Sequence, residues 1–253
     1  MIQLSINPVL YQFGVLRIGY YNLVYIVGFF VAYFVLRQMV KRQRIKNLSL
    51  RNLDDFILYF AIGLIAGARL FYFMFYNPST FVHDPLEIFR LWHGGMSFHG
   101  GLIGVIIATL LFCRKCQVKF YDIADILVIP ASLMLFFGRI ANLINGEVIG
   151  TVTNLSFCIK YPGIEGCRHP SQIYEALKNL LIFFVLLAVG RKKKLKPGTV
   201  FWLFVLLYGS LRFLVTFFRD DPRFLGLSAG QYLSLAMAIV GAVFLYRIFK
   251  KMP

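Results

Sequence analysis

Seven runs of about 18 to 24 predominantly apolar residues dominate this sequence, and a helix of that length can cross a bilayer. Hydrophobic residues make up 59% of the 253 residues and charged residues 15%, with a mean hydropathy of +0.71. A soluble domain of this length could not bury so much apolar surface. The sequence therefore predicts an all-α polytopic membrane protein with seven transmembrane helices. The expected spans are approximately 18–37, 54–76, 97–113, 122–144, 172–190, 198–217 and 230–249.

Basic residues predict the orientation, because Lys and Arg concentrate in the cytoplasmic loops of membrane proteins. They cluster after the first, third and fifth runs and in the C-terminal tail, so we expect the N-terminus outside and the C-terminus in the cytoplasm. The net charge of +16 does not indicate a nucleic-acid partner, since these residues lie in short loops and not on one soluble face. The clusters contain Lys41, Arg42, Arg44, Lys46 and Arg51, then Arg114, Lys115 and Lys119, then Arg191, Lys192, Lys193, Lys194 and Lys196, and finally Arg247, Lys250 and Lys251.

The whole chain, residues 1–253, is expected to form a single transmembrane domain with two elements outside the spans. Residues 77–95 combine aromatic residues with scattered charges, which is typical of an arm lying in the outer interface. Residues 146–169 form a polar loop with Gly, Pro and two Cys, and we expect a small extracytoplasmic cap there. The first apolar run has neither a basic segment before it nor a cleavage site, which indicates an uncleaved first helix.

The four cysteines fall on opposite sides of the membrane in the predicted topology. Cys113 and Cys116 form a CxxC with no second Cys or His pair on the reducing side, which favours ordinary free thiols over a metal or redox site. Cys158 and Cys167 lie in the cap loop, where an oxidising compartment would permit a disulfide. Their spacing in the sequence leaves that pairing open. The sequence predicts no metal site.

Polar and ionisable residues inside the apolar runs are the main indication of function. Such side chains cost at least ~2.5–3.5 kcal/mol each when they enter a bilayer. In the predicted topology they all fall in the outer leaflet, although they come from five different helices. Several such groups at one depth predict a polar chamber for chemistry or transport. The residues are Tyr21, Arg69, His99, Arg139, Asn142 and Arg212.

These arginines also have a structural interpretation, because an Arg can snorkel to the interface or pair with a carboxylate. We favour that interpretation for Arg69 alone. It fits Arg139 and Arg212 less well, since few acidic residues lie within the spans. The nearest acidic residues are Glu147 and Glu175. Unpaired guanidinium groups beside lipid headgroups favour an anion, and the donor fork of Arg matches the oxygens of phosphate.

His99 is a candidate general base, because a histidine beside an anion site can exchange a proton near neutral pH. A lone histidine on a membrane helix is more often a hydrogen-bond partner of another helix. The neighbouring Gly100 and Gly101 favour the catalytic interpretation, since they leave space for a substrate. Chemistry of the residues thus indicates an outer-leaflet anion site for a phospholipid, with an available base.

Five stretches of the chain resemble the prolipoprotein diacylglyceryl transferase family, and they occur in the order in which that family has them. The most specific is the thirteen-residue run GRIANLINGEVIG at 138–150. The others are YY at 20–21 followed by YIVGF at 25–29, GGMSFHGGL at 94–102, HPSQIYE at 169–175, and RFLV at 212–215 with FFR at 217–219.

The resemblance implies a transferase of the bacterial inner membrane that catalyses the first step of lipoprotein maturation. Such an enzyme moves the sn-1,2-diacylglyceryl group of phosphatidylglycerol to the lipobox cysteine thiol of a prolipoprotein signal peptide. A thioether forms and glycerol phosphate leaves, without a metal or organic cofactor. A seven-span topology with the N-terminus outside is also implied, in agreement with the basic loops.

The resemblance also implies roles for individual residues. Arg139 is expected to contact the phospholipid headgroup; Arg69, which the resemblance does not cover, is a further candidate for that contact because it lies in the same predicted polar layer. Asn142, Glu147 and Gly150 complete the functional positions of the 138–150 run. His99 and Arg212 match residues of the reaction centre, with Tyr21 as an accessory.

One position departs from the family pattern, which commonly has Glu four residues after the Arg of the sixth helix. Thr216 occupies that position here, so Arg212 is either free for phosphate or paired with another group. Two other functions compete with the transferase. A transporter would also place charges in the membrane, although no inverted repeat is visible. A non-catalytic lipid-binding protein would use the basic loops for anionic lipid.

Overall fold

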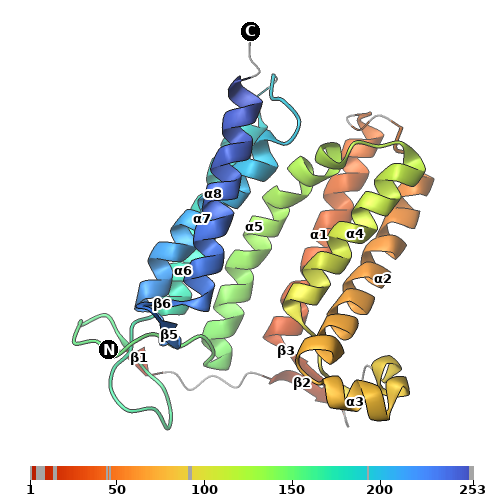
Figure 1. Ribbon diagram of the computed structural model, residues 1–253. Helices are drawn as coiled ribbons and strands as arrows, with labels where there is room; N and C mark the ends of the chain where they lie inside the picture. Colours follow the sequence, from red (N-terminus) through yellow and green to blue (C-terminus); the bar gives the residue numbers. More distant parts are fainter. Residues whose placement is uncertain are drawn as a thin grey trace. The chain divides into compact units, whose positions relative to one another are not determined.

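The computed structural model describes residues 2–3, 9–13, 16–43, 45, 47–90, 93–192 and 194–250, and it is mostly helical (Figure 1). The chain divides into two compact units. One consists of Val35–Ile123, and the other of Met1–Phe34 together with Ala124–Pro253. The prediction of a single transmembrane domain with an arm at 77–95 and a cap at 146–169 stays a prediction.

Six helices of the described chain are long and apolar enough to cross a membrane, and their ends lie within four residues of six expected spans. Their outer faces are apolar, because Leu58, Ile62 and Ile239 are each more than half exposed. Glu175 and Gln231, by contrast, are fully buried. This inverted pattern is that of a polytopic helical membrane protein. The helices are α2 (Leu50–Phe75), α4 (Phe98–Cys116), α5 (Phe120–Asn145), α6 (Ser171–Gly190), α7 (Thr199–Val215) with its continuation η3 (Thr216–Phe218), and α8 (Ala229–Lys250).

The first expected span corresponds to α1 (Tyr20–Lys41), which has 22 residues. The count of seven spans and their orientation stay predictions. Short strands accompany the helices: β2 (Val9–Phe13) pairs with β3 (Leu16–Gly19), β1 (Ile2–Gln3) with β4 (Ile159–Lys160), and β5 (Arg223–Phe224) with β6 (Leu227–Ser228). They were not predicted, because strands of two to five residues are too short for a clear alternating pattern.

Glycines bring α2 and α4 into backbone contact within the unit Val35–Ile123. A Cβ on Gly63 would lie 2.6 Å from the Cβ of Ala108 and 2.7 Å from the carbonyl oxygen of Gly104. Gly67 and Gly100 approach each other just as closely. This contact matches the small residues at four-residue spacing, a pattern that lets helices pack closely in lipid. Close packing of these two helices therefore depends on the missing side chains.

The segment between α2 and α4 contains α3 (Pro78–His83) and η1 (Pro85–Phe89), and residues 91–92 of the expected arm lie outside the described residues. Glu87 accepts hydrogen bonds from Arg90 Nη1 at 2.8 Å and lies 2.6 Å from His93 Nδ1. The Arg90 and His93 side chains hold the pKa of the Glu87 carboxyl below its ordinary value. The carboxylate therefore links η1 to the residues just before α4.

In the other unit, α7 packs against α6 and α8 (Figure 1). The α7 N-terminus is fixed by Asp125 of α5, whose carboxylate accepts from the backbone N–H groups of Gly198 at 2.6 Å and Phe201 at 2.7 Å. A carboxylate at a helix N-terminus satisfies free N–H donors and opposes the positive end of the helix dipole. Gly209 of α7 allows the close approach of α8, since a Cβ there would lie 2.6 Å from the carbonyl oxygen of Ser234.

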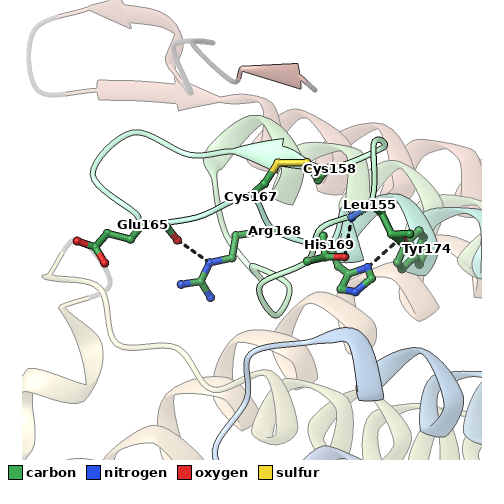
Figure 2. Close-up of a disulfide and its surroundings, with 8 residues drawn as sticks. Leu155, Cys158, Glu165, Cys167, Arg168, His169 and Tyr174 are labelled. Atoms are coloured by element: carbon green, nitrogen blue, oxygen red, sulfur yellow. Dashed lines mark hydrogen bonds between the residues drawn. A yellow bond between two sulfur atoms is a disulfide. The ribbon is translucent and has the colours of Figure 1, made fainter.

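Residues 146–169 form a loop that is held together by a disulfide between Cys158 and Cys167 (Figure 2). The pairing left open by the sequence is thus present in the structure. Backbone hydrogen bonds in both directions join Ile159 and Arg168, so the disulfide closes a short paired segment. His169 follows this paired segment directly and precedes Pro170, the N-cap of α6.

We predict that Gly63→Ala destabilises the protein by about 1–3 kcal/mol, because the added methyl group overpacks the α2–α4 contact. Thermal unfolding in detergent should show a Tm that is several degrees lower. Gly138→Ala in α5 is the matched control, since a Cβ there meets no atom within 4 Å. Equal Tm values for the two variants would contradict this account of the packing.

We also predict that only two of the four cysteines react with a thiol reagent after denaturation without reductant, namely Cys113 and Cys116. Mass spectrometry of the labelled chain counts the adducts directly. After reduction, all four should react. Four adducts without reductant, in protein purified from its oxidising compartment, would mean that Cys158 and Cys167 are unpaired.

Candidate active site

A cluster of charged residues surrounds the Glu175 carboxylate in the first turns of α6. Arg139 Nε of α5 lies 3.7 Å from Glu175 Oε2, and Arg212 Nη1 of α7 lies 3.9 Å from Oε1. Arg219, just after η3, places Nη1 at 3.7 Å from Oε1. Lys178, one turn along α6, donates to Oε2 at 2.7 Å. Four segments, namely α5, α6, α7 and the residues after η3, thus supply four cations to one carboxylate, which lies completely inside the unit.

The cations differ in how far solvent reaches them. The Lys178 side chain is 2% exposed, whereas those of Arg139 and Arg212 are 16% and 23% exposed. Tyr208 lies between the two kinds: its ring faces Lys178 Nζ at 4.2 Å, and its hydroxyl accepts from Arg212 Nη1 at 3.2 Å. Glu175 and Lys178 are therefore closed off from solvent, whereas Arg139 and Arg212 form the solvent-accessible edge of the cluster.

A chain of side-chain hydrogen bonds leads from Arg139 through the 138–150 run. Arg139 Nη1 donates to Asn142 Oδ1 at 3.2 Å, and Asn142 Nδ2 donates to Glu147 Oε2 at 2.7 Å. Asn145 Nδ2 donates to the other oxygen of Glu147 at 3.2 Å. The amide of Asn142 is 5% exposed, so this chain fixes it against the arginine. The predicted Arg139, Asn142 and Glu147 thus form one connected group.

The backbone after α5 turns back onto the start of α6. Gly146 adopts a φ of +68°, a conformation that favours glycine directly after a helix. Gln172 Nε2 then donates to the Glu147 carbonyl at 2.5 Å, and Ser171 Oγ donates to the Val148 carbonyl at 2.5 Å. Tyr161 of the cap supports Gln172 with a hydrogen bond of 3.0 Å, and burial raises the pKa of the Tyr161 phenol, which stays a donor.

Gly150 lies where three segments meet. A Cβ there would collide with the His169 backbone, and Gly150 forms a β-bridge with Arg219. The neighbouring Thr151 N–H donates to the Phe218 carbonyl at 3.0 Å. A residue with a side chain would separate the 138–150 run from α6 and η3. Gly150 is therefore part of the scaffold that brings Arg219 to the cluster, and its side-chain-free contact explains why the position needs glycine.

The cluster has the chemistry of an anion site. Arg139 and Arg212 lie at ion-pair distance from Glu175, yet among the described residues their side chains hydrogen-bond only to the neutral oxygens of Asn142 and Tyr208. Most of their N–H donors therefore remain for a further acceptor. Two partly exposed guanidinium groups that converge from separate helices suit the oxygens of a phosphate.

Thr216 occupies the position of the family's Glu, and its hydroxyl donates to the Arg212 carbonyl at 2.7 Å. A threonine bonded in this way completes the last turn of α7 and offers Arg212 no charge. Glu175 of α6 supplies the carboxylate near Arg212 instead. Arg212 is therefore neither free nor tightly paired. It forms a long ion pair of 3.9 Å with Glu175 and keeps N–H donors for a further acceptor.

The three other predicted residues either belong to the other unit or have a side chain outside the described residues. Tyr21 is in the first turn of α1, and its side chain lies outside the described residues. His99 is an exposed residue in the first turn of α4, two residues after the N-cap Ser97, in the unit Val35–Ile123.

Arg69 forms its hydrogen bonds within the unit Val35–Ile123. It is 2% exposed, and its guanidinium donates to backbone carbonyls of the segment before α4. With its donors occupied by neutral carbonyls inside the unit, Arg69 holds that segment against α2. This arrangement fits the structural interpretation of Arg69, and the expectation that Arg69 contacts a headgroup stays a prediction. The acceptors are the carbonyls of Glu87, Ile88, Arg90, Gly94 and Gly95.

Lys178 and Tyr208 were not predicted. Lys178 follows Glu175 by three residues and Tyr208 precedes Arg212 by four, which places each on the same helix face as its partner. That spacing is the signal in the sequence, although α6 and α7 had to be paired before it became informative. Among the described residues, no group of three or more His, Cys, Asp or Glu side chains is arranged to hold a metal ion.

Comparison with known proteins places this chain among relatives of one kind. Residues 8–247 match the family model described as prolipoprotein diacylglyceryl transferase. Proteins named phosphatidylglycerol–prolipoprotein diacylglyceryl transferase are similar over nearly the full length of both chains. The one from Geobacter sulfurreducens is 44% identical over 93% of each chain, that from Rickettsia canadensis 40% over 96%, and that from Bordetella parapertussis 41% over 94%. The chain belongs to the prolipoprotein diacylglyceryl transferase family.

Proposed function

We propose that this protein transfers the sn-1,2-diacylglyceryl group of phosphatidylglycerol to the cysteine thiol in the lipobox of a prolipoprotein signal peptide. Family membership and the names of the relatives support the reaction. The observation that carries it is the convergence of Arg139 and Arg212 on one cluster with donors left for an anion. A phospholipid phosphate is the anion that the substrate would present there.

In the proposed reaction, the cysteine sulfur attacks the glyceryl carbon that carries the phosphate oxygen. A C–S bond forms, the C–O bond to the phosphate breaks, and glycerol phosphate leaves with the electron pair. Negative charge therefore builds on the phosphate side of the transition state. Preorganised cations stabilise such charge more strongly than water does. We assign this role to Arg139 and Arg212, with Asn142 and Glu147 orienting Arg139 and Gly150 supporting the fold around them.

The attacking thiol has to lose its proton, because the thiolate is the nucleophile. We assign the proton acceptor to His99 and an accessory role to Tyr21, and both assignments rest on the family resemblance. Cations beside the thiol would also lower its pKa, so a larger fraction is already thiolate and the reaction depends less on a general base. No cofactor enters this scheme, since the leaving glycerol phosphate is already part of the lipid substrate and no atom is oxidised or reduced.

We place the protein in the bacterial inner membrane, with seven spans, the N-terminus outside and the C-terminus in the cytoplasm. The basic loops support this orientation. It puts the charged cluster, the disulfide-containing cap 146–169 and the arm 77–95 on the extracytoplasmic side. A disulfide suits an oxidising compartment, and secreted prolipoproteins arrive on that side.

A transporter and a lipid-binding protein remain the competing functions. A transporter needs a polar path through the membrane, whereas the Glu175 cluster lies at one end of α6 and is followed along that helix by the buried apolar Ile182 and Leu186. A lipid-binding protein would share the anion site without transferring any group. Transfer to a thiol separates all three.

We predict that the purified protein moves labelled diacylglyceryl from phosphatidylglycerol to a lipobox peptide in detergent micelles. Mass spectrometry of the peptide measures the added mass, and a peptide with Ser in place of the lipobox Cys is the control. Lipid that binds or crosses a vesicle membrane without modifying the Cys peptide would identify one of the competing functions.

We predict that Arg139→Ala lowers the transfer rate by a factor of 100 or more, on the order of the loss of one preorganised donor at a transition state. Arg139→Lys should also retain little activity, because Lys keeps the charge but lacks the fork that holds phosphate and Asn142. Arg51→Ala, an exposed residue in the first turn of α2, is the control and should be close to the unchanged protein. Full activity of Arg139→Lys would refute the forked contact.

A further inference from the structure

Lys178 is buried within a membrane-spanning helix, where a charged side chain is costly and usually has a functional or structural role. Its side chain is 2% exposed, and Nζ lies 2.7 Å from Glu175 Oε2, whose side chain is 0% exposed. This is the shortest contact of Glu175 with any of the four cations around it. Burial of both groups excludes them from direct contact with a lipid substrate. Any influence of Lys178 on the reaction therefore has to pass through Glu175.

The geometry around Glu175 shows what Lys178 changes. Its hydrogen bond occupies Oε2, and among the described residues Oε1 has no hydrogen-bond partner. The three arginines lie at 3.7, 3.9 and 3.7 Å, close enough to be attracted but too far for hydrogen bonds. The carboxylate thus orients Arg139 and Arg212 by electrostatic attraction but accepts no hydrogen bond from either of them.

We propose that Lys178 is a positioning residue that neutralises Glu175 and so keeps Arg139 and Arg212 available for the substrate phosphate. Without Lys178, Glu175 is a buried carboxylate whose nearest cations are the arginines. They would move the short distance to hydrogen-bond with it, and the phosphate would then compete with an internal anion. The inference rests on the proposed function, because it assumes that the arginines receive a phospholipid phosphate.

Tyr208 fits the same arrangement. Its ring covers Lys178 Nζ at 4.2 Å, and its hydroxyl accepts from Arg212 Nη1 at 3.2 Å. The aromatic face stabilises a cation that has few other partners. The hydroxyl thereby occupies one N–H of Nη1, the Arg212 nitrogen that also lies nearest to Glu175. Lys178, Tyr208 and Glu175 together therefore define where Arg212 stands before substrate arrives.

The test compares Lys178→Met with Lys178→Arg and with the double variant Lys178→Met/Glu175→Gln. Two quantities are measured for each: equilibrium binding of labelled phosphatidylglycerol to the purified protein without peptide, and KM and kcat of transfer in mixed micelles. Lys160→Met is the matched control, because Lys160 is an exposed lysine of β4 in the same unit. Thermal unfolding of every variant shows whether it folds.

For Lys178→Met we expect binding of phosphatidylglycerol to weaken and KM to rise by about tenfold or more, with a smaller change in kcat. Lys178→Arg should recover part of the binding, because it restores a cation. The double variant should recover most of it, since a neutral Gln no longer competes for the arginines. Lys160→Met should resemble the unchanged protein.

Unchanged binding and KM in Lys178→Met would overturn the proposal. So would a lower Tm with a loss of kcat alone that neither Lys178→Arg nor the double variant relieves, since that result describes a purely structural lysine. Failure of the proposed function looks different. In that case the unchanged protein binds phosphatidylglycerol but modifies no peptide, and the binding data still decide the role of Lys178. Absence of binding in the unchanged protein would overturn both.

Discussion

The Glu175 carboxylate and the cations around it are the interaction on which the rest of this structure depends. A carboxylate inside a membrane-spanning helix is tolerable only when cations and hydrogen bonds compensate for the lost water, and removing one partner of such a buried pair costs about 3–5 kcal/mol. Here α5, α6, α7 and the segment after η3 each contribute to that compensation. The cluster therefore binds these elements together and at the same time collects positive charge at one end of the unit.

The surrounding backbone is arranged to keep that charge in place. Gly146 and Gly150 let the 138–150 run fold back between α6 and η3. Two polar side chains of α6 then donate hydrogen bonds to backbone carbonyls of this run. The cap contributes Tyr161 and the disulfide-closed segment that leads to His169. Positions such as Gly150 and Glu147, which carry the family resemblance, thus act mainly by fixing where Arg139 and Arg219 stand. A transferase for a lipid headgroup benefits from this rigidity, because preorganised donors lose little freedom when the phosphate arrives.

The glycines of α2 and α4 illustrate how much a local sequence pattern can reveal. The four-residue spacing of Gly63 with Gly67, and of Gly100 with Gly104, is a pattern that favours close helix packing, and α2 and α4 meet there. The same pattern could not show which helices pair, since spacing describes one helix at a time. Arg69 demonstrates the opposite limit. An arginine in an apolar run is expensive wherever it lies, but only the folded backbone of the segment before α4 reveals that five carbonyls accept its hydrogen bonds.

By itself, the sequence determined that this chain is a helical membrane protein, the ends of six described helices to within four residues, and the family to which it belongs, because apolar length and the 138–150 run are local properties of the chain. It also predicted that Arg139 and Arg212 bind an anion, and that role stays a prediction. Only the tertiary structure decided that Glu175 stands between them, that Lys178 and Tyr208 complete the cluster, and that Cys158 pairs with Cys167. The physical reason is that charge compensation inside a membrane depends on distances between helices. Residues far apart in the sequence set those distances, and no periodicity within one segment records them.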